Sequence, residues 1–130
     1  MNENLIKFKV EKTYKDLDVY KLSYELALKI HKLALSLPDL EKYNLVSQLR
    51  KAAMSIPANI AEGMTRNAFP NDLIRFLRIA IGSSVEVQVW LNFAKDLQYI
   101  SLENFEELNL EYDRVGKMLR GLTKYWASKI

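Results

Sequence analysis

A stripe of apolar side chains near the C-terminus is the feature that most restricts the fold of this chain. Between residues 105 and 126 the apolar positions alternate between steps of three and four residues: Phe105, Leu108, Tyr112, Val115, Leu119, Leu122 and Trp126. This spacing keeps all of them on one face of an α-helix and is typical of helices that pack with a left-handed crossing. Ser101 precedes the stripe, where its hydroxyl can cap the helix. The stripe therefore predicts a long C-terminal helix that packs along one side.

Three earlier stretches carry the same pattern of small or apolar residues three or four positions apart. The sets are Val19, Leu22, Leu26, Ile30, Leu33 and Leu37; Leu45, Leu49, Ala52, Ile56 and Ile60; and Leu73, Leu77, Ala80, Ser84, Val87, Leu91 and Ala94. Four helices with short links predict an all-α fold, an antiparallel up-down-up-down four-helix bundle. We expect the bundle to occupy residues 16–130. Residues 1–15 lack periodicity, and we expect them to form a flexible N-terminal arm.

Glycine and proline are scarce, with four glycines and three prolines among 130 residues, and this argues against a turn-rich β fold. Their positions predict where helices end. Pro38 closes the first helix, Gly63 supplies a left-handed residue after the second, which begins near residue 41, and Pro70 opens the third. Either Asp16 or Asp18 is placed to cap the first helix.

Two of these rare residues fall inside helical patterns. Pro57 predicts a kink in the second helix, or a split with Ser55 capping its second part. Gly82 lowers helix propensity by about 1 kcal/mol relative to alanine, so some interaction should offset that loss. Because Ala80, Ser83 and Ser84 are also small, we expect the tightest helix packing at this point.

The residue inventory excludes several kinds of chemistry. No cysteine is present, which rules out disulfides, cysteine nucleophiles and thiolate metal sites. A ferritin-like metal bundle requires Glu-x-x-His pairs, but Leu28 stands three residues before the sole histidine, His31. We therefore expect no catalytic residue, no metal and no cofactor, and we expect the protein not to be an enzyme.

No segment has the character of a targeting or membrane-spanning sequence. The first 20 residues lack an apolar run of 7–15 residues, and no stretch approaches 18 uncharged apolar residues. We expect a cytoplasmic protein that does not contact a membrane.

Two polar motifs accompany the second and third stripes. Their polar members are Gln48, Arg50, Asn59, Glu62 and Arg66 in the first and Ser83 and Glu86 in the second. If the two helix faces meet, Glu62 and Glu86 need donors, because a buried carboxylate without a partner is strongly unfavourable. The candidate donors are Gln48, Arg50 and Arg66. We interpret the set as a structural network that fixes helix register; the alternative is a ligand-binding or catalytic pair of carboxylates.

These motifs resemble the signature of a family of small four-helix-bundle proteins encoded by intervening sequences in bacterial 23S ribosomal RNA genes. The matching positions are Gln48, Leu49, Arg50, Ala53, residues 55–63, Arg66, Ile79, Ala80, Gly82, Ser83 and Glu86, with Asp16, Leu17, Val19, Tyr20, Leu97, Tyr99 and Ile100 at the flanks. The resemblance covers roughly residues 16–124. Residues 64–71 and the arm of residues 1–15 depart from it.

The resemblance implies an antiparallel bundle that assembles as a cyclic homopentamer, and it implies no enzymatic activity. Related members are accessory proteins of diversity-generating retroelements, in which a basic pentamer works with a reverse transcriptase and nucleic acid. Many others are stand-alone proteins of unknown role. Ribosomal RNA or another nucleic acid is the partner that the family suggests.

Charge is unevenly distributed along the chain, although the net charge is only +3. Residues 103–113 contain five acids and no base, whereas residues 114–129 contain five bases and no acid. Candidate phosphate-binding residues are Arg114, Lys117, Arg120 and Lys124, together with Arg75 and Arg78. The alternative explanation is complementarity to the helix dipole. We favour electrostatic binding of RNA or DNA, with a protein-interaction scaffold as the second hypothesis.

Several large apolar residues lie off the predicted stripes, namely Tyr20, Tyr24, Phe76, Trp90 and Phe93. In a monomer they would leave apolar patches on the surface, which is typical of subunit contacts. They can also be ordinary exposed residues beside a wide core. The family resemblance favours a homo-oligomer.

Overall fold

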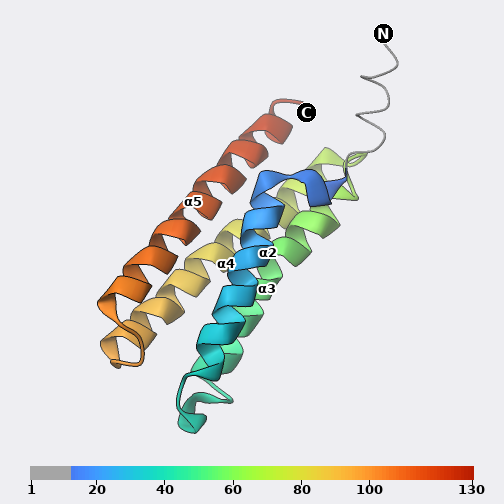
Figure 1. Cartoon of the computed structure of the whole chain (residues 1–130). Coiled ribbons are helices and arrows are strands. Elements are labelled where there is room, and N and C mark those ends of the chain that lie inside the picture. Colours follow the sequence, from blue (N-terminus) through green and yellow to red (C-terminus); the bar gives the residue numbers. More distant parts are fainter. Residues whose placement is uncertain (1–12) are drawn as a thin grey trace.

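Four long helices form the protein in a computed structural model that describes residues 13–130. They are α2 (Asp18–Leu35), α3 (Leu45–Met64), α4 (Pro70–Asp96) and α5 (Leu102–Ala127), with short 3-10 helices η1 (Tyr14–Asp16) and η2 (Asp39–Glu41). No strand occurs within residues 13–130. The helices alternate in direction along the chain (Figure 1), as short links require. The predicted all-α four-helix bundle is confirmed.

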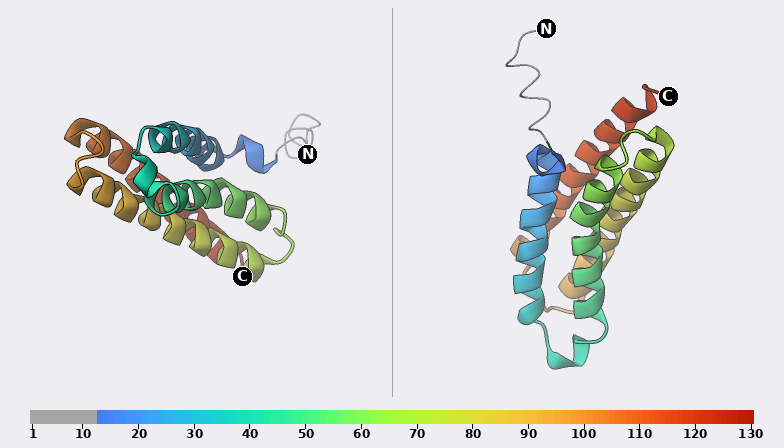
Figure 2. Two further views of the ribbon diagram at one scale, coloured as in Figure 1. Left: turned by 90° about the horizontal axis from the view of Figure 1, so that it is seen from below. Right: turned by 90° about the vertical axis from the view of Figure 1, so that its right-hand side faces the viewer.

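Consecutive helices are neighbours, but the bundle is not equally closed on all sides. The most extensive contacts join α3 to α4 and α4 to α5, followed by α2 to α3, whereas α2 and α5 touch much less. The right-hand view of Figure 2 shows the α2–α3 hairpin in front of the α4–α5 hairpin. The side between α2 and α5 is a groove of about 640 Å³ lined by Leu22, Lys29, Leu108 and Glu111 among others.

The apolar stripes of the sequence form the core. Fully buried members come from all four helices and include Leu26, Ile30, Leu49, Ile56, Ile60, Leu73, Leu77, Val87, Leu91, Tyr112, Val115 and Leu119. Leu108, Leu122 and Trp126 pack against this core from partly buried positions. Burial of apolar surface is the main force that holds amphipathic helices together.

The helix starts follow the sequence at two of four places. Ser101 caps α5, because its hydroxyl accepts a hydrogen bond from the amide of Asn104 at 3.1 Å, and α4 starts at Pro70. The capping of α2 by Asp16 or Asp18 was wrong. Leu17 is the residue ahead of α2 and makes no side-chain cap. Asp16 instead closes a capping box with Thr13 at the start of η1.

Gly63 does not end α3 in the left-handed conformation, so that prediction was wrong. Helix α3 continues to Met64, and no glycine within residues 13–130 has a positive φ. Gly63 lies where α4 approaches most closely: a Cβ at this position would be 3.0 Å from Cβ of Phe76 and 3.3 Å from the carbonyl oxygen of Leu73. The left-handed residue is Gln98 after α4, with φ 63°. Packing, not chain reversal, requires glycine at position 63.

Helix α3 is continuous through Pro57, so of the two predictions for this residue, a kink or a split, the split was wrong. Pro57 is buried inside the helix, and Ser55 caps no second helix. Ser55 instead bonds across to α4. The expected start near residue 41 was also early, because η2 precedes α3 and the helix begins at Leu45. The expected arm of residues 1–15 lies mainly outside the described residues.

Candidate nucleic-acid interface

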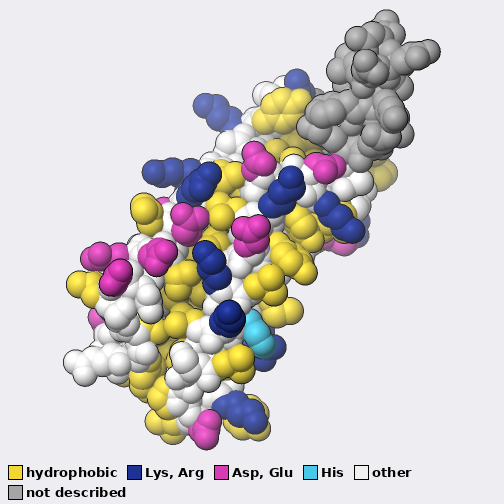
Figure 3. Space-filling view, in the orientation of Figure 1, with side chains coloured by type: hydrophobic (Ala, Val, Ile, Leu, Met, Phe, Trp, Pro, Cys, Tyr) yellow, Lys and Arg dark blue, Asp and Glu magenta, His cyan; other side chains and the backbone are white. Residues whose placement is uncertain are grey.

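The bases of α5 all lie in its C-terminal half. Arg114, Lys117, Arg120 and Lys124 are exposed, and the acids of the helix lie in the opposite half. Figure 3 shows dark-blue side chains over the upper part of α5 and magenta side chains below them. Spacings of three and four residues keep the four bases on one broad face of the helix.

Helix α4 adds two arginines at the same end of the bundle. Gln88 of α4 donates hydrogen bonds to the carbonyl oxygen of Asn109 at 3.2 Å and to a carboxylate oxygen of Asp113 at 2.8 Å. This fixes the register of the antiparallel pair and brings the first turns of α4 beside the last turns of α5. Arg75 and Arg78 occupy those first turns and are exposed.

The end of α3 completes this group through stacking on an aromatic ring. The guanidinium carbon of Arg66 lies 5.2 Å from the ring centroid of Phe76, and that of Arg75 lies 4.6 Å from the same centroid. Stacking of this kind holds a guanidinium group in place while its N–H donors remain available. We call the end of the bundle that carries Arg66, Arg75, Arg78, Arg114, Lys117, Arg120 and Lys124 the basic end.

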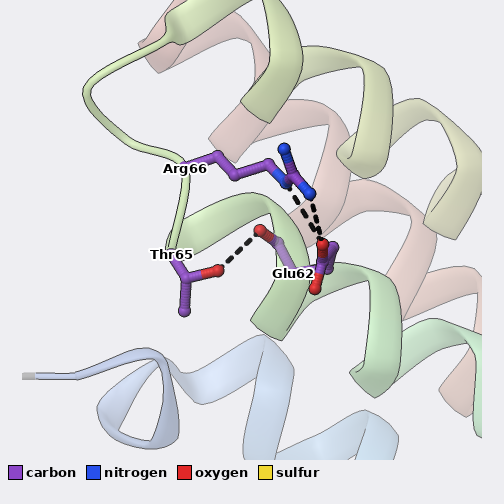
Figure 4. A network of polar contacts seen from close by, with 3 residues as sticks. All are labelled: Glu62, Thr65 and Arg66. Carbon is purple, nitrogen blue, oxygen red and sulfur yellow. Dashed lines mark hydrogen bonds and ion pairs between the residues drawn. The ribbon is translucent and has the colours of Figure 1, made fainter.

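Arg66 also has an acidic partner. Its Nε and Nη2 atoms donate to Oε1 of Glu62 at 3.1 and 2.8 Å, one turn back on α3, and the Thr65 hydroxyl donates to the Glu62 carbonyl (Figure 4). These hydrogen bonds, and then the negative charge of Glu62, raise the pKa of Arg66. Of the ion pairs between described residues, none involves the other six bases of the basic end.

The polar residues of the two motifs do not form one network. Ser83, Ser55 and Asn59 join α3 to α4, with 2.9 Å between the two hydroxyls and hydrogen bonds from Asn59 Nδ2 to both oxygens of Ser55. Glu62 is half exposed near the end of α3 and pairs with Arg66, which follows that helix. Glu86 is exposed and accepts a hydrogen bond from Trp90 Nε1 at 3.2 Å.

Two residues that were expected to donate to these carboxylates lie elsewhere. Gln48 is half-buried near the start of α3, and Arg50 is exposed at the rim of a groove between α2 and α3. The structure therefore gives Glu62 and Glu86 separate surroundings. It does not bring them together as a pair of carboxylates around one ligand.

Two long-range polar contacts have no counterpart in the sequence analysis. One is the bond of Gln88 to α5, and the other joins the hydroxyl of Tyr99 to Oε2 of the buried Glu41 at 3.1 Å, across 58 positions of the chain. Burial, and then the hydrogen bond to Glu41, raise the pKa of Tyr99. No local pattern marks either pair, because each joins residues of two elements that come together only in the folded protein.

The described residues contain no group of three or more His, Cys, Asp or Glu side chains that could hold a metal ion. His31 is exposed on α2 and lines the groove between α2 and α3. None of the helices in the described part of the chain is long and apolar enough to span a membrane.

Comparisons with known proteins agree on one family. The model of the 23S rRNA-intervening sequence proteins matches residues 15–121. A crystal structure from Bacteroides thetaiotaomicron, of a protein of unknown function from the S23 ribosomal protein family, is similar with a TM-score of 0.75 and 29% sequence identity. The match covers 82% of this chain and 95% of that one. No curated protein matches the chain. The chain belongs to the family of 23S rRNA-intervening sequence proteins.

Proposed function

We propose that the protein is a non-enzymatic homo-oligomer that binds RNA or DNA through the basic end. The observation that carries this proposal is the segregation of charge. Bases from α4, from α5 and from the turn after α3 gather at one end of the bundle, while the acids of α5 lie toward the other. A cluster of positive charge attracts a phosphate backbone, and binding releases the counterions that surround the nucleic acid.

The arrangement favours contact with phosphates over the recognition of bases. Arginine and lysine side chains on exposed helix faces neutralise phosphates without distinguishing one base sequence from another. The ring of Phe76 already stacks against Arg66 and Arg75. We therefore expect binding that depends strongly on salt and weakly on sequence. Ribosomal RNA is the first nucleic acid to test, since the family is defined by its link to 23S rRNA.

Oligomerisation would multiply the effect of each basic end. A cyclic homopentamer, which the family resemblance implies, would present five copies of the cluster to one nucleic acid. Exposed apolar side chains on α2 and α4, including Tyr24, Leu28, Val89 and Phe93, support assembly because they leave apolar surface in contact with water.

The test is charge reversal at the basic end. Arg120→Glu with Lys124→Glu should abolish retention of structured RNA or DNA at low ionic strength, while the oligomer stays intact. Lys32→Glu with Lys42→Glu is the matched control, because it makes the same change of charge near the opposite end of the bundle. Binding retained by the first variant would contradict the proposal, as would the absence of any salt-dependent binding by the nucleic-acid-free parent protein.

A protein-interaction scaffold is the second candidate. The groove between α2 and α5 favours it, because leucines on its floor alternate with Lys29, Lys32, Glu107 and Glu111 on its rims. A segment of a partner protein could bury apolar side chains there and pair with the charges. Capture of a protein partner that resists both nuclease and high salt would favour this function over nucleic-acid binding.

A further inference from the structure

Gly82 is a glycine that its own subunit does not require. It lies exposed in the middle of α4, and no atom of a neighbouring residue would come within 4 Å of a Cβ added there. At Gly63, by contrast, α4 lies too close for a side chain, and at Gly116 the guanidinium of Arg120 lies over the bare backbone. Glycine weakens the middle of a helix, and no close contact among the described residues explains why glycine stands at position 82.

Gly82 lies at the centre of an exposed apolar face. Ile79 precedes it by three residues, and Val85, Val89 and Phe93 follow at three, seven and eleven, so all four share its side of the helix. These side chains are 42%, 46%, 43% and 52% exposed. We call Ile79, Gly82, Val85, Val89 and Phe93 the α4 face. A helix face with small residues at its centre lets another backbone approach closely.

A second apolar surface lies on another side of the molecule, between α2 and α3. It is a groove of about 450 Å³ whose lining includes Tyr24, Leu28, His31, Met54, Pro57 and Ala58. Tyr24, Leu28 and Met54 are at least half exposed. We call this surface the α2–α3 groove. Its apolar walls and the small Ala58 suit a helix face that carries medium-sized side chains and a glycine.

The two surfaces lie at the same height along the bundle. The bond between Ser55 and Ser83 sets the register of α3 against α4, so that Met54 and Ala58 lie at the level of Val85 and Gly82. A rotation about an axis parallel to the bundle, with no shift along that axis, can therefore bring the α4 face of one molecule to the α2–α3 groove of the next.

One pair of charges beside the two surfaces is complementary. Glu86 is exposed next to Val85 on α4, and Arg50 is exposed at the rim of the α2–α3 groove. By the register of Ser55 and Ser83, both lie within about one turn of the level of Met54. When the surfaces meet, Glu86 of one copy and Arg50 of the next can pair at the edge of the contact.

We infer that the α4 face of one subunit packs into the α2–α3 groove of a second copy, with Gly82 at the point of closest approach. The inference rests on the homo-oligomer of the proposed function and names its contact. Because the two surfaces are unlike, the contact is head-to-tail. Repeating this contact closes a ring when the rotation between neighbouring subunits is 360° divided by a whole number.

The first experiment compares two exposed glycines. Gly121 of α5 is also exposed with no neighbouring atom within 4 Å of an added Cβ. Gly82→Gln and Gly121→Gln should both fold, with helical circular dichroism at least equal to that of the parent. Light scattering coupled to size exclusion should show assembly weakened at least tenfold by Gly82→Gln and unchanged by Gly121→Gln. Full assembly of the folded Gly82→Gln variant would overturn the inference.

The second experiment tests whether the two surfaces are partners. Val89→Glu damages the α4 face and Met54→Glu damages the groove, so each variant alone should be monomeric. An equimolar mixture should form heterodimers, because each variant contributes one intact surface to a single contact. Full assembly of Met54→Glu by itself would indicate that α4 faces pair with one another and would overturn the inference.

The outcomes separate this inference from the proposed function. A parent protein that is monomeric at all concentrations would overturn both the homo-oligomer and this contact. A parent oligomer that tolerates Val89→Glu and Met54→Glu would overturn only the contact. The monomeric variants lose the multiplied effect of several basic ends, so weaker nucleic-acid retention by them does not test the basic end. Arg120→Glu with Lys124→Glu tests it separately, because that variant keeps the oligomer.

Discussion

The hydroxyl oxygens of Ser55 in α3 and Ser83 in α4 lie 2.9 Å apart, and this hydrogen bond joins the two helices that pack most extensively. Asn59 donates to the Ser55 hydroxyl and to its carbonyl oxygen, so the two serines and the asparagine form one satisfied group. Such a bond gives a pair of apolar helix faces a preferred register, because sliding by one turn would leave polar atoms buried without partners.

Ser83→Ala should destabilise the protein by about 1 kcal/mol, because it removes the bond to Ser55 from a partly buried contact. Chemical denaturation measures the change. Ser128→Ala is a suitable control, since the Ser128 hydroxyl bonds only to the Tyr125 carbonyl at an exposed helix end. Equal effects of the two substitutions would contradict a role for Ser83 in joining the helices.

Gly63→Ala should destabilise the protein by about 1–3 kcal/mol, because the added methyl group would meet the backbone of α4 and Cβ of Phe76. Gly121→Ala, in open space on α5, should instead stabilise by up to about 1 kcal/mol through helix propensity. Thermal unfolding of both variants tests the difference in sign. A stabilised Gly63→Ala variant would show that α4 can move away at little cost.

Gln98→Gly should stabilise the protein by about 1 kcal/mol. Gln98 follows α4 with φ 63°, and the amides of Gln98 and Tyr99 bond back to the carbonyls of Lys95 and Ala94. This is the helix ending that glycine adopts without the steric penalty of a Cβ. The midpoint of denaturation should rise, and an unchanged or lower midpoint would mean that the Gln98 side chain supplies a compensating contact.

Tyr112→Phe should stabilise the protein by about 1 kcal/mol near neutral pH, because the buried Tyr112 hydroxyl has no hydrogen-bond partner among the described residues. Burial also raises the pKa of Tyr112 above that of the unfolded chain. Above about pH 10 the unfolded parent loses this proton before the folded one, so parent stability falls by up to about 1.4 kcal/mol per pH unit.

Tyr112→Phe removes this ionisable group. The free energy of unfolding of this variant should therefore exceed that of the parent by a growing amount as the pH rises above about 10. Denaturation of both proteins at pH 7 and at several alkaline values measures the difference. A constant difference across that range would show that the Tyr112 hydroxyl ionises as easily in the folded protein as in the unfolded chain.

Lys124→Gln should weaken nucleic-acid binding and reduce the slope of log affinity against log salt by about one, the value for one lost phosphate contact. Titrations at several salt concentrations measure the slope. Lys42→Gln, near the opposite end, should leave it unchanged. If both substitutions change the slope equally, the nucleic acid responds to the net charge of the whole protein and not to the basic end.

Much of the fold could be predicted from the sequence, because helix formation and burial leave local patterns. The spacing of apolar residues identified the buried faces of all four helices, and the hydroxyl of Ser101 identified the start of α5. Both signals arise within a few residues of the chain, since a helix repeats every 3.6 residues and a cap acts on its own first turn. The charge division along α5 is equally local.

Only the tertiary structure decided which partners Gly63, Ser55 and Glu41 contact. Gly63 is required by the approach of Phe76, Ser55 bonds to Ser83, and Glu41 binds Tyr99, each with a partner on another element. The sequence motifs also suggested one network around Glu62 and Glu86, which the structure separates. These outcomes depend on the register and distance between packed helices, and a pattern within one helix carries no information about either.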